Sequence, residues 1–324
     1  MKEGVVLIAK NPEGKLVSAL ETELNREETY CCPGCQGRVL LRQGQVMCPH
    51  FAHKSLQDCQ FFSENESAQH LSLKAALYKS LVNHGEKVRI EKVLSEMGQI
   101  ADLFVGDSLA LEVQCSRLSQ QRLRERTRAY QQAGYEVRWL LGEDLWLGRR
   151  LTDLQRDFFY FTAKIGFHLW ELDWKKEEIR LKYLIYEDIF GKVYYLTKTW
   201  PLTENLMTVL RYPYQAEKVE TYQVTQRKKV SHVIQRELMG KNPRWMRRQE
   251  EAYLKGMNLL CLSDQDFFPQ VRFPESRQGF VQIRQSLEGF EKLFKKYYRK
   301  RHFSYRQTLY PPTFYAKIEK NRHN

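Results

Sequence analysis

The sequence has no long apolar run, since nowhere do about 18 apolar residues follow one another, the length that a membrane-spanning helix needs. Its opening, MKEGVVLIAKNPEGK, holds only a few consecutive apolar residues before a turn, too few for a secretory signal. Internal repeats and low-complexity linkers are also missing. These absences exclude membrane-spanning and repeat architectures, and we expect a cytoplasmic protein without a membrane span.

Acidic residues are scarce relative to basic ones. Among 324 residues, 39 Asp and Glu stand against 52 Lys and Arg, so the net charge is +13. Such a balance favours a polyanionic partner, nucleic acid before any other. The chain is 42% hydrophobic and 28% charged, which is typical of a globular protein, and its length suffices for two or three domains.

Cysteine is rare outside one short segment. Only Cys115 and Cys261 lie elsewhere, whereas five cysteines and two histidines gather near the N-terminus. These are Cys31, Cys32, Cys35, Cys48, Cys59, His50 and His53. In a cytosolic chain this clustering indicates a metal site rather than disulfides.

The spacing of these residues predicts a structural zinc ion. In CCPGC, the Pro-Gly pair supplies the tight turn that lets Cys32 and Cys35 reach one ion. We favour His53 and Cys59 as the other two ligands, with His50 and Cys48 as alternates. Four protein ligands leave no open position for catalysis. The competing interpretation is a small hairpin domain with incidental cysteines.

Hydrophobic periodicity predicts a mixed α+β chain in three parts. Residues 1–62 form a small β-rich module, zinc-ribbon-like, with turns at NPEG and CPGC. Residues 63–148 have the order α-β-β-β-α-β: helix 63–84, strands 87–94, 99–106 and 109–116, helix 119–134 and strand 135–142. Ser63 and Glu66 form a candidate capping box at the start of the first helix.

Polar residues interrupt two strands of this central part. Asp102 lies among apolar residues in QIADLFV, and Glu112 and Gln114 share one face of LALEVQCS. The two strands form a predicted hairpin, which makes Asp102 and Glu112 cross-strand neighbours. Like charges so close are unfavourable without a cation between them, and carboxylates suit Mg²⁺ or Mn²⁺. Alternatively, Asp102 starts a turn, Glu112 pairs with an arginine and Gln114 caps a strand edge.

The third part, residues 149–324, begins with aromatic-rich strand patterns over 156–174 and 178–200, with a turn at 190–191. From about 202 the pattern becomes mostly helical, broken at GKNP. The tail 291–324 has ten Lys or Arg, two acidic residues and eight aromatics. Basic and aromatic side chains together favour single-stranded DNA as a partner, although a basic helix with inward-packed aromatics gives the same pattern.

Several of these motifs together resemble a known family. Asp102-x9-Glu112-x-Gln114 in an α-β-β-β-α-β order is similar to the restriction-endonuclease-like core of the PD-(D/E)xK nucleases. CPGC, HFAH, ESAQH, ADLFV, EVQCS and VRWLL, with Arg126 and Tyr130, resemble the competence protein CoiA family of naturally transformable bacteria. The resemblance covers residues 1–145 best.

The resemblance implies a Mg²⁺- or Mn²⁺-dependent deoxyribonuclease that processes incoming DNA in natural transformation, with recombination proteins as possible partners and no small-molecule cofactor. Asp102 and Glu112 would ligate the metal. Gln114 stands where the motif usually has lysine, so it lacks the positive charge that lysine brings to the phosphate. A catalytically weak or inactive DNA-binding accessory protein is the alternative, and a zinc-dependent protein-interaction module is a third.

The first helix and its surroundings offer further candidate site residues. Glu66, His70 and Lys74 lie one turn apart on one face. If that face overlooks the carboxylates, Glu66 is an extra metal ligand, His70 a catalytic or phosphate-contacting group and Lys74 a phosphate contact. Helix capping by Glu66 and a plain surface position for His70 are the alternatives. Ser116, Arg117 and Arg126 are candidate substrate contacts, although Arg126 can instead pair with Glu125.

Overall fold

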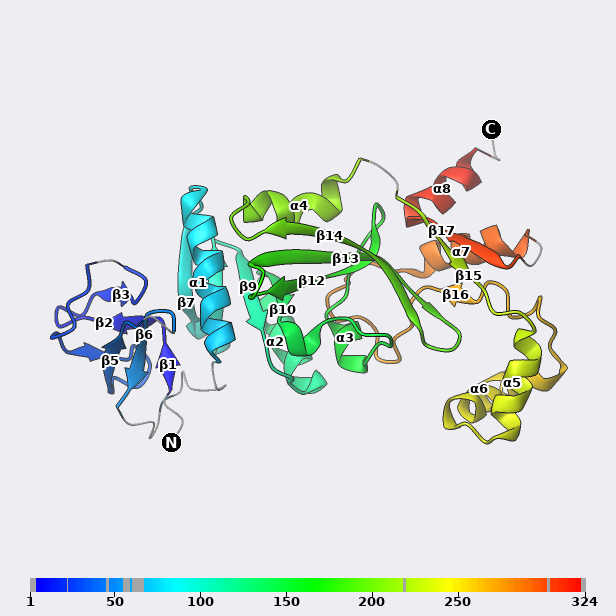
Figure 1. Ribbon diagram of the computed structural model, residues 1–324, viewed down its shortest axis with the longest axis horizontal. Helices are drawn as coiled ribbons and strands as arrows, with labels where there is room; N and C mark the ends of the chain where they lie inside the picture. The colour runs from blue at the N-terminus through cyan, green and yellow to red at the C-terminus, as the bar shows by residue number, and fades with distance from the viewer. Residues whose placement is uncertain are drawn as a thin grey trace.

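The computed structural model describes residues 4–21, 23–44, 47–54, 59, 67–217, 220–301 and 304–321. Two sheets dominate the fold, a small one at the N-terminal end and a large one in the centre, and helices α5 and α6 lie at the opposite end from the small sheet (Figure 1). No helix among the described residues is long and apolar enough to cross a membrane.

The N-terminal sheet has six short antiparallel strands in the order β1-β6-β5-β4-β2-β3. The strands are β1 (Val5–Val6), β2 (Ile8–Lys10), β3 (Leu16–Ser18), β4 (Tyr30–Cys31), β5 (Arg38–Arg42) and β6 (His50–His53). Leu7, Tyr30, Val39 and Phe51 are buried and give this sheet its apolar interior. These residues belong to the same buried cluster as the apolar side chains of the large sheet.

The central elements follow the predicted order. They are α1 (Ala68–Asn83), β7 (Val88–Leu94), a 3₁₀ turn (Ser95–Met97), β8 (Gln99–Val105), β9 (Leu109–Gln114), α2 (Gln120–Gln132) and β10 (Glu136–Leu141). β7, β8 and β9 are antiparallel, whereas β10 returns through α2 to pair parallel with β9. A parallel partner requires such a crossover.

Helix α1 begins later than the capping-box pattern suggests. Ser67 is its N-cap, and the Ser67 hydroxyl accepts a hydrogen bond from the His70 amide. Ser63 and Glu66, the expected capping pair, lie outside the described residues. The helix ends as expected, because Gly85 adopts a left-handed φ of +78° directly after the His84 cap.

The large sheet continues past residue 148, where we expected the central part to end. β10 pairs parallel with β12 (Gly166–Asp173), and β13 (Glu178–Asp188) and β14 (Val193–Pro201) follow antiparallel. The order is β14-β13-β12-β10-β9-β8-β7, with β11 (Tyr160–Thr162) paired to β12 and β16 (Val271–Arg272) paired to β13. One buried core therefore runs through both parts.

The rest of the chain is less helical than its sequence suggests. Its helices are α3 (Asp153–Asp157), α4 (Leu206–Gln215), α5 (Val230–Met239), α6 (Pro243–Tyr253), α7 (Glu288–Arg299) and α8 (Pro312–Lys320), with 3₁₀ turns at Glu143–Leu145 and Leu259–Cys261. β15 (Tyr222–Thr225) and β17 (Arg306–Leu309) form a separate antiparallel pair. The predicted break at GKNP is confirmed: α5 ends before it and α6 starts at Pro243.

Four aromatic side chains of the basic tail pack inward. Phe294, Tyr297 and Tyr298 of α7 are buried, and so is Tyr315 of α8. The ring centroids of Phe294 and Tyr315 lie 5.4 Å apart. These rings join the core because α7 and α8 pack on each other, so they are not available to stack on bases. For them the alternative interpretation, a basic helix with inward aromatics, is correct.

Candidate metal centre and acidic site

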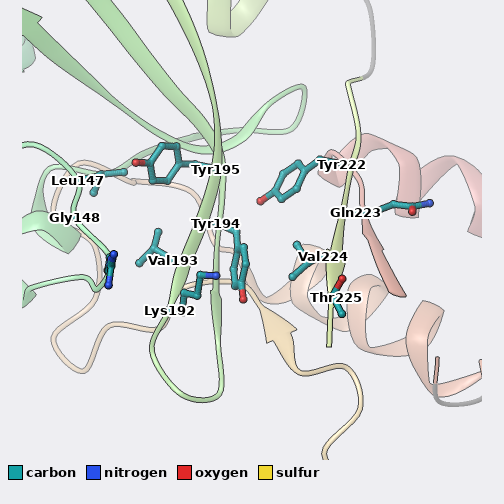
Figure 2. A pocket seen from close by; sticks show the side chains of 11 residues that line it. Leu147, Gly148, Lys192, Val193, Tyr194, Tyr195, Tyr222, Gln223, Val224 and Thr225 are labelled. Carbon is teal, nitrogen blue, oxygen red and sulfur yellow. The ribbon is translucent and has the colours of Figure 1, made fainter. Parts of the chain in front are cut away.

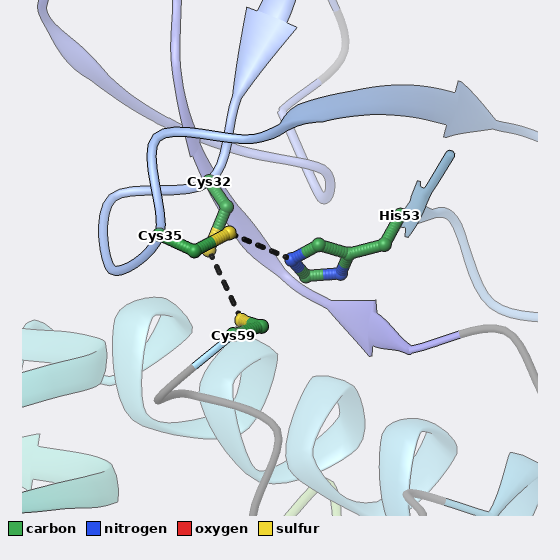
Figure 3. Close-up of side chains that lie close together, drawn as sticks. All are labelled: Cys32, Cys35, His53 and Cys59. Carbon is green, nitrogen blue, oxygen red and sulfur yellow. Dashed lines mark hydrogen bonds between the residues drawn. The ribbon is translucent and has the colours of Figure 1, made fainter. Parts of the chain in front are cut away.

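The structure brings Cys32, Cys35, His53 and Cys59 together, the four ligands that we favoured. Their ligand atoms all lie within 4.8 Å of one another, and no other such group of His, Cys, Asp or Glu occurs in the described part of the chain. Cys32 Sγ lies 3.7 Å from Cys59 Sγ, and Cys35 Sγ lies 3.6 Å from His53 Nε2 (Figure 3). Two thiolates on one tetrahedral zinc ion are about 3.8 Å apart, so the donors fit this ion.

Neighbouring backbone groups orient these donors. His53 Nδ1 lies 2.9 Å from the Gly4 carbonyl oxygen, an arrangement that leaves Nε2 for a metal. The Gly37 amide donates to Cys35 Sγ at 3.3 Å, at the end of a turn in which Gln36 has a φ of +59°. A Cys₃His group whose ligands are oriented by backbone hydrogen bonds in this way is compatible with structural zinc.

The alternates Cys48 and His50 lie outside this group. His50 is buried, and its Nδ1 contacts the Cys48 carbonyl oxygen at 2.9 Å rather than the four ligands. The strand alternation explains the difference, because His50 and His53 are three positions apart on β6 and therefore project to opposite faces.

The predicted relation between Asp102 and Glu112 appears in the strand register. Leu103 pairs with Leu111, and the same register carried one residue further sets Asp102 opposite Glu112. Here the ladder opens: Asp102 Oδ2 accepts a hydrogen bond from the Val113 amide at 2.8 Å. The carboxylate thus takes the place of a backbone acceptor where β8 and β9 separate.

A third carboxylate, which belongs to none of the motifs described above, completes the row. The register of β7 and β8 sets Glu91 opposite Asp102, and Glu91 has a left-handed φ of +49°. Its carboxylate accepts hydrogen bonds from the amides of Leu7 and Ile8, at 3.0 and 3.2 Å. An acidic residue in the middle of the strand VRIEKVL is the signal that could have drawn attention to it.

Helix α1 supplies cations to this row. Lys74, which has no exposed surface, lies 2.7 Å from Glu91 Oε1 and 3.6 Å from Asp102 Oδ1. His70 Nε2 lies 3.2 Å from Asp102 Oδ2. Burial alone raises the pKa of Asp102, but the neighbouring His70 and Lys74 outweigh it and hold the pKa below its ordinary value. The predicted face of His70 and Lys74 therefore lies against Asp102, one member of the acidic pair, and Glu66 lies outside the described residues.

Glu112 has its own partners on α2. Arg126 donates to Glu112 Oε2 at 2.8 Å and Tyr130 donates a short hydrogen bond to Oε1. Burial raises the pKa of the Glu112 carboxyl to about 7, although the Arg126 guanidinium lowers it. Arg126 also lies 5.1 Å above the Trp139 ring. Each carboxylate therefore has a protein cation beside it, Lys74 at Asp102 and Arg126 at Glu112.

The remaining candidates lie at the end of β9. Gln114 is buried, and its Nε2 donates to the Ser116 carbonyl oxygen at 2.9 Å, so it caps the strand end as the alternative interpretation proposed. Ser116 and Arg117 are exposed next to it. Arg126 pairs with Glu112 rather than with Glu125, whose carboxylate accepts from Gln121.

Comparison with known proteins identifies two domain types in this chain, an N-terminal domain followed by a nuclease-like domain. Residues 16–62 match the family described as "Competence protein CoiA, N-terminal domain", and residues 66–215 match "Competence protein CoiA, nuclease-like domain". A curated relative, "Competence protein CoiA" of Bacillus subtilis (strain 168), is 29% identical over 130 residues, 39% of this chain and 35% of the relative. No solved structure matches the chain.

These matches define a protein with a small N-terminal domain, here carrying the Cys₃His group, followed by a nuclease-like domain. The chain belongs to the competence protein CoiA family. The resemblance found in the sequence is thereby confirmed, and the match with the curated relative spans about a third of that protein's length.

Proposed function

We propose that this protein is a Mg²⁺- or Mn²⁺-dependent DNA nuclease of the bacterial cytoplasm that acts on DNA taken up in natural transformation. The observation that carries the proposal is the opposition of Asp102 and Glu112 at the point where β8 and β9 separate. The role in competence rests on the name of the family and of the curated relative. Recombination proteins are the partners that such a role implies.

We further propose that α1, β7, β8, β9, α2 and β10 form a restriction-endonuclease-like core. An antiparallel β8–β9 hairpin followed by a helical crossover to a parallel strand supports this. In such a core acidic residues of the second and third strands lie opposite one another, and the register of β8 and β9 gives Asp102 and Glu112 this relation.

The donor set fits a hard divalent cation. Carboxylate oxygens are the ligands that Mg²⁺ prefers, and Asp102 and Glu112 would hold it. The carboxylates of Glu91, Asp102 and Glu112 outnumber the cations Lys74 and Arg126 among the described side chains at this site, which leaves net negative charge when Glu112 is ionised and His70 is neutral. When bound, the metal supplies activation of a water molecule and neutralisation of phosphate charge.

The protein's own groups contribute position and charge. Lys74 lies where its ammonium group can balance negative charge beside Asp102. In the PD-(D/E)xK motif a lysine at the position of Gln114 has this role, and Gln114 carries no charge that could do the same. His70 Nε2 holds Asp102 Oδ2 in place. Asp102 and His70 are each 14% exposed, whereas Lys74 and Glu112 have at most 2% exposure. DNA phosphate therefore has access from the side of Asp102 and His70.

The test compares DNA cleavage by the wild type with Asp102→Asn and Glu112→Gln, using single- and double-stranded DNA with Mg²⁺, Mn²⁺ or EDTA. Glu125→Gln, an exposed position on α2, is the matched control. We expect metal-dependent cleavage by the wild type and the control and only background cleavage by the other two variants. A wild type that cuts with neither metal, or an active Asp102→Asn variant, contradicts the proposal.

One observation favours a second function, a DNA-binding accessory protein that retains the fold without cleavage. Both oxygens of Glu112 already have partners, Arg126 and Tyr130, and Gln114 is turned toward Ser116. A wild type that binds DNA and cuts nothing with either metal would support this function.

A further inference from the structure

Two adjoining cavities lie between β14, β15 and the loop 147–150, far along the chain from the acidic row. Their volumes are about 690 and 510 Å³. Both are lined by Arg149, Lys192, Tyr194 and Thr225, so they form one continuous groove. Figure 2 shows the first cavity, with the rings of Tyr194 and Tyr222 at the gap between β14 and β15.

The groove is basic. Arg149, Arg150, Lys192 and Arg227 line it and are exposed, and among the described lining residues Asp188 is the one acidic side chain. Asp188 is already occupied, because its carboxylate accepts from the amides of Phe190 and Lys192 at 2.8 and 2.9 Å. The Asp188 carboxylate therefore stabilises the turn between β13 and β14.

Two of the groove cations, Lys192 and Arg227, lie over aromatic rings. Lys192 Nζ lies 4.8 Å from the Tyr194 ring centroid, and the Arg227 guanidinium lies 4.5 Å from that of Phe190. Among the described residues, no ion pair joins Arg149, Arg150, Lys192 or Arg227 to an acidic side chain. A ring contact orients a cation without cancelling its charge, so these charges remain available to anions.

A buried donor at the same place also lacks a partner. Gln226 lines the second cavity and is 4% exposed, and its Nε2 has no hydrogen-bond partner within the described portion of the chain. Buried donors are almost always satisfied, and a bound ligand is one of the ordinary explanations for an exception.

We propose that this groove binds single-stranded nucleic acid. Arg149, Arg150 and Arg227 contact phosphates, and bases stack against the half-buried tyrosines of β14 and β15. The combination of backbone-tracking cations with ring faces is what sequence-tolerant single-strand binders use. The inference rests on the proposed action on DNA and moves the expected DNA contact from the tail to the groove.

Fluorescence anisotropy of a labelled oligothymidylate in EDTA, with the full chain, tests the groove without cleavage. Arg149→Ala combined with Arg227→Ala is expected to weaken binding about tenfold and to lower the slope of log affinity against log salt by about 1.4, because each single-strand phosphate contact contributes about 0.7. The matched control is Arg299→Ala combined with Lys300→Ala, two exposed tail cations whose loss changes the net charge equally. We expect the control to bind within about twofold of the wild type.

Stacking is tested separately with an abasic oligonucleotide of the same length. The wild type is expected to prefer the oligothymidylate, and Tyr194→Leu is expected to lose most of that preference. Equal losses in the groove and tail variants, an unaffected groove variant, or tighter binding of duplex than of single strands would overturn the proposal. Binding is measured in EDTA, where metal-dependent cleavage does not occur, so a wild type that binds through the groove but never cleaves with Mg²⁺ or Mn²⁺ refutes only the nuclease function.

Discussion

Lys74 and Glu91 form a 2.7 Å ion pair in which the lysine side chain has no exposed surface. The same glutamate accepts the Leu7 and Ile8 amides of the N-terminal sheet, and the same lysine lies beside Asp102. One glutamate therefore connects the N-terminal sheet to the acidic row of the large sheet. A buried pair that loses one partner leaves an uncompensated charge, which makes this connection sensitive to substitution.

Glu91→Gln is expected to lower the free energy of unfolding by about 3 kcal/mol, because Lys74 then loses the nearer of the two carboxylates that contact it among the described residues. Urea denaturation measures the change. Glu96→Gln, at an exposed glutamate just after β7, should stay within about 0.5 kcal/mol of the wild type. Similar losses in both variants would mean that the Lys74–Glu91 pair has no special weight.

Zinc content distinguishes the four favoured ligands from the alternates. We expect the purified wild type to carry about one zinc ion per chain and Cys35→Ser to lose it, since the donor set then has three members. Cys48→Ser should keep the metal, because Cys48 lies outside the group of four. Inductively coupled plasma mass spectrometry on both variants gives the answer, and zinc loss from Cys48→Ser alone would reverse the assignment.

The ionisation of Glu112 is expected to lower the free energy of unfolding as the pH rises. Its pKa in the folded protein is about 7, above its ordinary 4.5, so folding favours the protonated carboxyl. That contribution is complete below about pH 4.5 and is lost as the pH rises through about 7. Between about pH 5.5 and 8.5 the wild type should lose about 2 kcal/mol relative to Glu112→Gln, which cannot ionise.

Urea denaturation at several pH values measures this difference. Asp102 stays ionised over the whole range, because its pKa lies below the ordinary value, and so it adds no slope. Glu125→Gln is the control for general charge effects. If the stability of the wild type relative to Glu112→Gln instead stays constant or increases with pH, Arg126 keeps Glu112 ionised over the whole range.

The buried aromatic residues of the tail stabilise the core. Phe294→Ala is expected to cost about 3–5 kcal/mol of stability, because Phe294 is 2% exposed and its ring contacts those of Tyr298 and Tyr315. Tyr305→Ala, at a ring that is 50% exposed, should cost under about 1 kcal/mol. Thermal unfolding measures the stability of both variants. A loss of under about 1 kcal/mol in Phe294→Ala would mean that this ring is not needed in the core, and would again favour the tail as a surface on which bases stack.

The strands of the central part could be predicted closely from the sequence. Alternating apolar residues gave 87–94, 99–106, 109–116 and 135–142, and the strands run over 88–94, 99–105, 109–114 and 136–141. The same alternation set Asp102 opposite Glu112. Local periodicity carries this information because each side chain's face depends on its immediate neighbours.

Long-range partners could not be predicted in the same way. Glu91 takes its role from a left-handed backbone and from amides 84 and 83 positions away, and neither leaves a local pattern. The Arg126 pair with Glu112 depends on how α2 crosses the sheet. His53 and Cys59 were harder to predict as metal ligands than Cys32 and Cys35 for the same reason, because only the CPGC turn brings two ligands together locally.

The parallel pairing of β10 with β12 determines where the chain could be shortened. A fragment ending at residue 148 would leave the backbone of β10 as an unpaired edge and strip Trp139 and Leu140 of neighbours from the later strands, conditions that promote aggregation. The match to the nuclease-like family instead ends at residue 215, the last residue of α4, beyond the final strand β14. The stretch shared with the family therefore includes the whole main run of the large sheet.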